Sequence, residues 1–357
     1  MDMSRIANYL AFDIMSNVIF GRDFALLEDS KYRPVVEALK ASNVRMGVLL
    51  QTDAMRTLRM DKRLFPKAVE GRNIFVQFVK NLLADRFGGS EKGANDMISL
   101  LDEGKSDGNK LKKSELLAEG VTLVVAGDLA DKPCLTERHD CANTATGSDT
   151  TATALSGFLF YMSKHQELLE RARLEVTTAF QASAKIKPGK ALSECHFLRA
   201  CIQETMRMSP PASTVLWREV EGEGIELGGH HVPAGCEVGV SIYSLHHNEQ
   251  YLPEPFVFNP DRRSHGEENE KVSRVAFMPF SIGPRSCIGR SLALQELMVT
   301  TAHLLWRFDM KFDPADQMCN LSSGHPSEYA LGDHVTSATE GPWIRWRLRQ
   351  ARSQGFE

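Results

Sequence analysis

The sequence predicts a mainly α-helical fold, a helix bundle with small β-sheets, and two observations predict it. Apolar residues recur at helical spacing through much of the first two thirds of the chain. After Pro210 the chain changes to short β-like pieces separated by Gly and Pro. With 42% hydrophobic and 25% charged residues, the composition is that of an ordinary globular protein. We therefore expect a buried core and exclude wholesale disorder.

The helices are predicted from the spacing of apolar residues and from helix-ending signals. Ile6, Leu10, Ile14 and Val18 share one helical face. A helix that ends near residue 208 stops before Pro210, because proline disfavours helical geometry in the residue before it. Helices are also expected over 31–50, 69–87, 114–125, 163–181 and 192–208, and after Gly289.

Strands are predicted where short apolar or β-branched runs alternate with Gly and Pro. The segment WIRWRLR near the C-terminal end alternates as a strand does. The other short β-like pieces are 213–218, 225–227, 231–232 and 238–243.

Charge and cysteine usage exclude several classes of protein. The formal net charge is −4, which offers no general attraction to nucleic-acid phosphates. Seven scattered cysteines suit a reducing compartment better than a disulfide framework. The N-terminal segment has charged residues within its apolar stretch, so we interpret it as an amphipathic helix and not as a signal peptide. No apolar run reaches the length of a membrane span.

The segment FSIGPRSCIG at 280–289 is the most informative part of the chain. Cys287 lies between glycines, two residues after Arg285 and directly before a predicted helix. Such a loop can present a thiolate beside exposed backbone N–H groups, and a thiolate can bind a metal. The glycines permit close approach to a flat cofactor, and Arg285 can pair with an anionic group on it. The alternative for a single cysteine is a small buried apolar side chain.

The whole pattern FxxGxRxCxG resembles the haem-binding loop of cytochromes P450. The resemblance implies the cytochrome P450 fold, with Cys287 as the axial thiolate on the iron of heme b, iron protoporphyrin IX. It also implies that Phe280 shields the sulfur, that Arg285 contacts a propionate and that Gly289 belongs to the cofactor-binding loop.

A second motif precedes the predicted sheet region. Glu204 and Arg207 are three residues apart, so they lie on one helical face and can form an ion pair. By itself such a pair is usually an exposed surface pair. Cytochromes P450 carry an ExxR motif at this place, and an arginine of a PxRx segment completes it; the resemblance makes Arg262 the third member. Asp261 stands where the family more often has Glu. Arg218 matches a family position that holds a haem propionate, and a surface arginine is the alternative.

The oxygen-activating motif of the family has a partial counterpart here. The segment SDTT at 148–151 resembles the end of that motif, which implies that Asp149 and Thr150 deliver protons to dioxygen. Residues 128–147 separate it from Ala126-Gly127, and their removal restores AGSDTT within one apolar helix. We interpret 128–147 as an insertion, either translated or the product of an unspliced intron or a mis-drawn gene model. Its Cys134, His139 and Cys141 fit no standard zinc pattern.

The resemblance implies a haem-thiolate monooxygenase that inserts one oxygen atom from O2 into a small lipophilic substrate, in the style of fungal members that tailor natural products. Because the chain has no flavin or Rossmann-type fingerprint, electrons should come from NADPH through a separate NADPH-cytochrome P450 reductase. We expect a monomer with no nucleic-acid partner. For His246-His247 a structural role is favoured over a metal site.

We expect a single domain over 1–357 that lacks the leading section and membrane anchor of the family. The family suggests the cytosolic face of the endoplasmic reticulum membrane, and without its anchor the chain would be cytosolic. The alternative function is a truncated, inactive relic with weak or no haem binding. A helical scaffold without haem would require the cysteine loop to be a coincidence.

Overall fold

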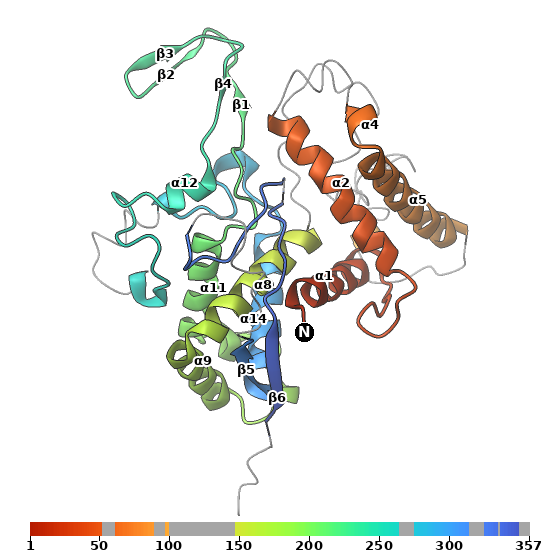
Figure 1. Ribbon diagram of the computed structural model, residues 1–357, viewed down its shortest axis with the longest axis vertical. Helices are drawn as coiled ribbons and strands as arrows, with labels where there is room; N and C mark the ends of the chain where they lie inside the picture. The colour runs from red at the N-terminus through yellow and green to blue at the C-terminus, as the bar shows by residue number, and fades with distance from the viewer. Residues whose placement is uncertain are drawn as a thin grey trace, which may run out of the picture.

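The structure is a computed structural model that describes residues 1–51, 61–88, 97–99, 147–263, 275–313, 325–334 and 336–349. It is a helical assembly with three small antiparallel sheets, and the labels below are those of Figure 1. The longer helices are α1 (Met3–Phe20), α2 (Arg33–Gln51), α5 (Pro66–Gly88), α8 (Gly147–Lys164), α9 (Gln166–Ala179), α11 (His196–Met208) and α14 (Arg290–Arg307). The short helices are α4 (Asp61–Leu64), α10 (Lys190–Ser193), α12 (Ile242–His246), η1 (Ser183–Lys185), η2 (Pro260–Arg263) and η3 (Gly283–Arg285).

The ends of helix α1 are set by its own capping residues. The Asp2 carboxylate accepts the backbone N–H groups of Ser4 and Arg5, which have no partner within the first turn. At the other end, Gly21 has a φ of 64° and its N–H bonds to the carbonyl of Asn17. Both signals are local, so the sequence alone accounts for the length of this helix.

Two hydrophobic clusters lie on either side of α1. Met3, Ala7 and Ala11 face a cluster formed mainly by α8, α9, α11 and α14. Phe12 and Ile19 belong to a second cluster, formed with α2 and α5. In Figure 1 the N-terminal helices α1, α2, α4 and α5 accordingly lie on one side and α8, α9, α11 and α14 on the other. Helix α1 therefore joins the two halves by being apolar on two faces.

Small residues allow the closest helix contacts. A Cβ at Gly157 of α8 would lie 3.0 Å from the Thr205 side chain of α11. A Cβ at Gly71 of α5 would clash with the backbone carbonyl of Ala38 in α2. Each glycine thus sets how near its helix approaches its neighbour.

The three sheets have two strands each. β1 (Arg218–Glu219) pairs with β4 (Glu237–Val238), and β2 (Ile225–Leu227) pairs with β3 (His230–Val232). These four strands form the arm that extends from the helical body in Figure 1. β5 (Phe308–Phe312) pairs with β6 (Ile344–Leu348), with Met310 opposite Trp346. The β5–β6 sheet places buried Met310 and Ile344 in the first cluster.

The observed elements confirm the mainly helical fold and most of the predicted segments. The strand prediction for 238–243 was wrong at its end, because Ser241 caps the helix α12 and its hydroxyl accepts the N–H of Ser244. Of the predicted strand 213–218 only Arg218 belongs to a strand, while Val215 forms an isolated bridge to Ser241. The predicted helix 114–125 and residues 128–146 of the predicted insertion lie outside the described residues, and Gly147 begins α8. Within the described ranges no helix has the length and apolar character needed to cross a membrane.

One buried acid makes the stability of this fold depend on pH. Burial raises the pKa of Glu296, on α14, from 4.5 to about 8. Between these values the folded state holds a proton that the unfolded state has lost, so the free energy of unfolding falls as the pH rises from 4.5 to 8. The slope is at most about 1.4 kcal/mol per pH unit. We predict that Glu296→Gln, which stays neutral, loses this slope in denaturant titrations across the window.

The control for this prediction is Glu167→Gln, which changes an exposed carboxylate at the start of α9. Its stability curve should run parallel to that of the wild type. A Glu296→Gln curve that also runs parallel to the wild type would contradict the assigned ionisation of Glu296.

Candidate active site

The cysteine loop is a tight turn that places Cys287 at the surface. The Cys287 N–H donates to the Phe280 carbonyl at 2.9 Å and closes the loop. Within it, Gly283 has a φ of 73°, a conformation that side chains other than glycine rarely adopt, and it begins the short helix η3. Gly289 is the N-cap of α14, so the cysteine lies just before the N-terminus of an 18-residue helix.

The surroundings of Cys287 combine apolar and basic side chains. Cys287 is exposed, and so are its neighbours Ile282 and Ile288, at 68% and 99%. Behind the loop, Phe280 packs against the main core cluster, and the guanidinium of Arg290 lies 5.7 Å from its ring centre. Arg285 is exposed in η3. The loop therefore exposes one sulfur and two large apolar side chains.

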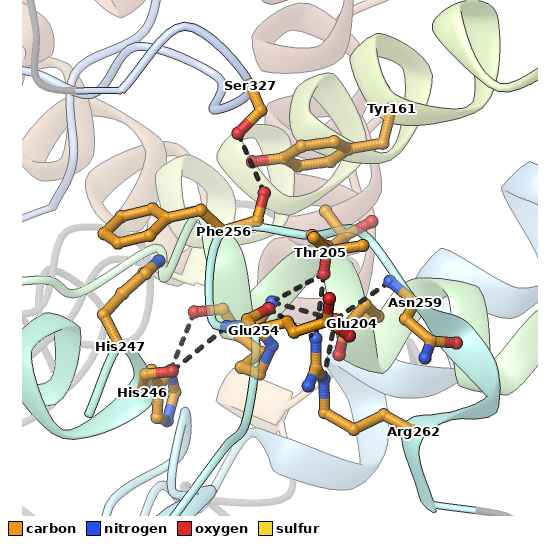
Figure 2. Close-up of polar contacts among 12 residues, drawn as sticks. Tyr161, Glu204, Thr205, His246, His247, Glu254, Phe256, Asn259, Arg262 and Ser327 are labelled. Carbon is orange, nitrogen blue, oxygen red and sulfur yellow. Dashed lines mark hydrogen bonds and ion pairs between the residues drawn. The ribbon is translucent and has the colours of Figure 1, made fainter. Parts of the chain in front are cut away.

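Glu204, Arg207 and Arg262 come together in a buried cluster, hereafter the ion cluster. Arg207 Nη2 lies 2.8 Å from Glu204 Oε1, and Arg262 Nε lies 3.2 Å from the same oxygen. The side chain of Arg207 is fully buried and that of Glu204 is 3% exposed. Figure 2 shows Glu204 and Arg262 facing each other, with Asn259 beside them. The Asn259 N–H also donates to Glu204, at 3.2 Å.

Backbone carbonyls use most of the remaining donors of the two arginines. Arg207 donates to His246 at 3.0 Å and to Val257 at 3.4 Å. Arg262 donates to Val257 at 2.9 Å and to Glu254 at 3.0 Å. The ion cluster thus joins α11 and η2 to the irregular segment that connects α12 with η2.

Asp149 and Thr150 lie in the first turn of α8. Asp149 is buried, and Asn43 of α2 donates to its Oδ2 at 2.6 Å. The same nitrogen of Asn43 donates to the Thr336 hydroxyl at 3.2 Å. Both protons of the Asn43 amide are thereby used, which fixes the orientation of the amide. Thr150 is half-buried beside Asp149.

Arg218 lies in β1, at the base of the extended arm. It pairs with Val238 across the β1–β4 sheet, and its Nη1 donates to the carbonyl of Trp217 at 2.7 Å. The side chain is half-buried.

Comparison with known proteins decides the family. A family model described as cytochrome P450 matches residues 142–331, which is more than half of the chain. A cytochrome P450 monooxygenase of Gibberella zeae is 43% identical over 98% of this chain and 78% of its own length. The cytochrome P450 monooxygenase apf8 of Gibberella fujikuroi is 41% identical over 98% of this chain and 92% of its own. The chain belongs to the cytochrome P450 family.

Other P450 monooxygenases match the chain over a smaller share of their own length. The cytochrome P450 monooxygenase poxM of Penicillium oxalicum is 40% identical over 97% of this chain, which spans 62% of that relative. These relatives carry the name of an oxidoreductase family whose members hold haem and receive electrons from a redox partner. The fold class and the family resemblance expected from the sequence are therefore confirmed.

The cysteine loop of this P450 fits the haem of the family. Cys287 supplies a soft sulfur donor of the kind that holds haem iron. Ile282 and Ile288 give the loop exposed apolar surface for a flat macrocycle, and Arg285 supplies a cation for a carboxylate at its rim. A Cβ at Gly289 would lie 3.7 Å from Cys287 Sγ, an ordinary van der Waals distance, so Gly289 lies directly beside the sulfur. Phe280, Arg285, Cys287 and Gly289 are the residues that would hold the group.

Asn43 is the residue at this site that sequence reasoning missed. It lies 106 positions before Asp149 in a helix that the sequence marks only as amphipathic. A buried asparagine on the core face of such a helix was the available signal, because a buried amide needs partners.

The ion cluster yields a stability prediction. Glu204→Gln leaves the guanidinium of Arg207 fully buried without its counter-charge. We predict a loss of about 3–5 kcal/mol in the free energy of unfolding, measured by denaturant titration. The matched control is Asp261→Asn, which breaks the exposed pair with Arg171 and should cost less than about 1 kcal/mol. Equal losses in the two variants would contradict the prediction.

The bond between Asn43 and Asp149 yields a second prediction, tested by a double-mutant cycle. Asn43→Ala and Asp149→Ala should show a coupling of about 1.5–3 kcal/mol in unfolding free energy, because a hydrogen bond to a charged group is strong. Ser163→Ala is the control, since Ser163 lies at the other end of α8 and donates to the Phe160 carbonyl within the same helix. Its effect should add to that of Asn43→Ala; additivity in the Asp149 cycle as well would refute the bond.

Proposed function

We propose that this P450 is a haem-thiolate monooxygenase that inserts one oxygen atom from O2 into a small lipophilic substrate. The observation that carries the proposal is the exposed Cys287 sulfur, flanked by Ile282 and Ile288 at the N-terminus of α14. We assign the cofactor as heme b and the electron source as NADPH, through a separate NADPH-cytochrome P450 reductase. The substrate class is assigned from the family, since the relatives from Gibberella zeae and Gibberella fujikuroi are fungal monooxygenases.

The residues of the loop have distinct roles in this proposal. Haem held by a cysteine thiolate would supply the activation of O2 when bound, because the thiolate donates electron density that favours O–O cleavage. Cys287 would provide that sulfur, from its place just before the N-terminus of α14. Phe280, packed on the core and bonded through its carbonyl to the Cys287 N–H, covers the sulfur from behind. Arg285 and Arg218 pair with the propionates.

Asp149 and Thr150 move protons in the proposed reaction. The Asp149 carboxylate would take up a proton from solvent. The hydroxyl of Thr150, the next residue in the same helical turn, would give its own proton to dioxygen and regain one from Asp149. Asn43 holds Oδ2 of Asp149 at 2.6 Å, which orients the carboxylate. Glu204, Arg207 and Arg262 have a structural role, since they hold the fold beside the loop.

The proposed domain organisation is one P450 domain over 1–357, with an insertion at 128–147. We propose that the protein works as a monomer at the cytosolic face of the endoplasmic reticulum or in the cytosol, on substrates of fungal natural-product chemistry. The competing function is an inactive relic that retains little or no haem.

A spectrum of the reduced, carbon monoxide-treated protein tests the proposed function. The wild type should retain haem and show the Soret band of a thiolate-ligated iron. Cys287→Ser should abolish that band, because the hydroxyl is a poor ligand for haem iron. The control is Cys236→Ser, at another exposed cysteine, which should leave the band unchanged. A wild type without haem would support the relic, and an unchanged spectrum in Cys287→Ser would overturn the assigned ligand.

A further inference from the structure

The paired histidines His246 and His247, at the end of α12, have different surroundings. His246 is completely buried between the end of α11 and the segment that leads into the cysteine loop. His247 instead points its Nε2 to Glu328, at 2.6 Å, and its Nδ1 to the Tyr243 carbonyl, at 2.8 Å. Of these two histidines, it is His246 that joins the ion cluster to the segment before the cysteine loop.

The two hydrogen bonds of the His246 ring have opposite polarity. The Met278 N–H donates to His246 Nε2 at 3.0 Å, so Nε2 carries no proton. Nδ1 lies 3.1 Å from the carbonyl of Arg207, and a carbonyl needs a donor. The ring is therefore neutral, with its proton on Nδ1. It also stacks on Phe277, with ring centres 5.3 Å apart.

Short bonds continue from this ring on both sides. Towards the core, Arg207 Nη1 donates back to the His246 carbonyl at 3.0 Å, so the ring and backbone of His246 both bind Arg207. Towards the loop, the Met278 carbonyl accepts the Ser281 N–H at 3.0 Å, and the Phe280 carbonyl accepts the Cys287 N–H. Figure 2 shows His246 close to the ion cluster that contains Glu204 and Arg262.

We propose that His246 is a positioning residue for the Cys287 loop. Its ring accepts the Met278 N–H and also binds the Arg207 carbonyl, so it ties the segment that leads into the loop to Arg207, whose charge is buried and paired with Glu204. The sulfur is held at a constant place while its open side remains accessible. That the place of the Cys287 sulfur matters for binding iron rests on the proposed function. The hydrogen bonds from His246 to Met278 and Arg207 do not depend on that function.

A pair of amide variants separates the two bonds of the ring. In His246→Gln the amide can reach the place of Nε2 and accept the Met278 N–H, whereas in His246→Asn the amide reaches the place of Nδ1 and can only bind the Arg207 carbonyl. We expect the Met278 and Cys287 amides of the full chain, without haem, to exchange hydrogen about tenfold faster in His246→Asn, as for loss of one hydrogen bond. In His246→Gln their exchange should stay close to that of the wild type.

The neighbouring histidine provides the matched control. His247→Asn alters the same short helix but contacts Glu328 and Tyr243. Exchange at Met278 should not change in this variant. Faster exchange in His247→Asn to the same extent as in His246→Asn, or equal effects of Gln and Asn at 246, would overturn the proposal, because a general loosening of α12 would then explain the result.

Two further measurements keep the test decisive. If His246→Asn does not fold, the ¹⁵N spectrum of the histidine-labelled wild type decides: a proton on Nδ1 supports the proposal, and a proton on Nε2 overturns it. After haem loading, His246→Asn should show part of its reduced carbon monoxide complex without the thiolate-type band, and His246→Gln should restore it. A wild type without that band would refute the proposed function, while the exchange experiment would still decide the role of His246.

Discussion

The fold depends most on one buried charge. The guanidinium of Arg207 is fully buried, and a charge in that position is tolerated only with a counter-charge and with hydrogen-bond acceptors for its protons. Glu204 supplies the charge, and the carbonyls of His246 and Val257, 39 and 50 residues further along, accept from the Nη atoms of Arg207. Because Arg262 binds the same carboxylate oxygen, this requirement forces α11, the irregular segment after α12, and η2 into one arrangement.

The cysteine loop is hydrogen-bonded to the protein at its back, and its front is exposed. At its back the loop is closed by the bond between Cys287 and Phe280, and its entry is bound through His246 to Arg207. At its front the sulfur and two isoleucines are exposed. A ligand atom for a metal must be fixed and still accessible, and this division between back and front satisfies both conditions. The ion cluster and the loop are thus parts of one structural unit.

The first turn of α8 is bonded to helix α2 in the N-terminal part of the chain. Asn43 of α2 binds Asp149 in the first turn of α8, and the same amide binds Thr336 from the C-terminal part of the chain. Three segments that are distant in sequence therefore meet at the carboxylate that we assign to proton transfer. Helix α1, apolar on two faces, holds α2 and α8 at this separation. The position of one acid thus depends on the packing of both hydrophobic clusters.

The sequence by itself determined the features whose causes are local. The pattern of Gly, Arg and Cys at 280–289 predicted the cysteine loop, and the spacing of three predicted that Glu204 and Arg207 pair, because loop conformation and helical faces follow from neighbouring residues. Only the tertiary structure decided that Asn43 binds Asp149 and that His246 binds Met278. These depend on groups between about 30 and 106 positions apart, and burial decides which polar groups must meet; no local pattern carries that information.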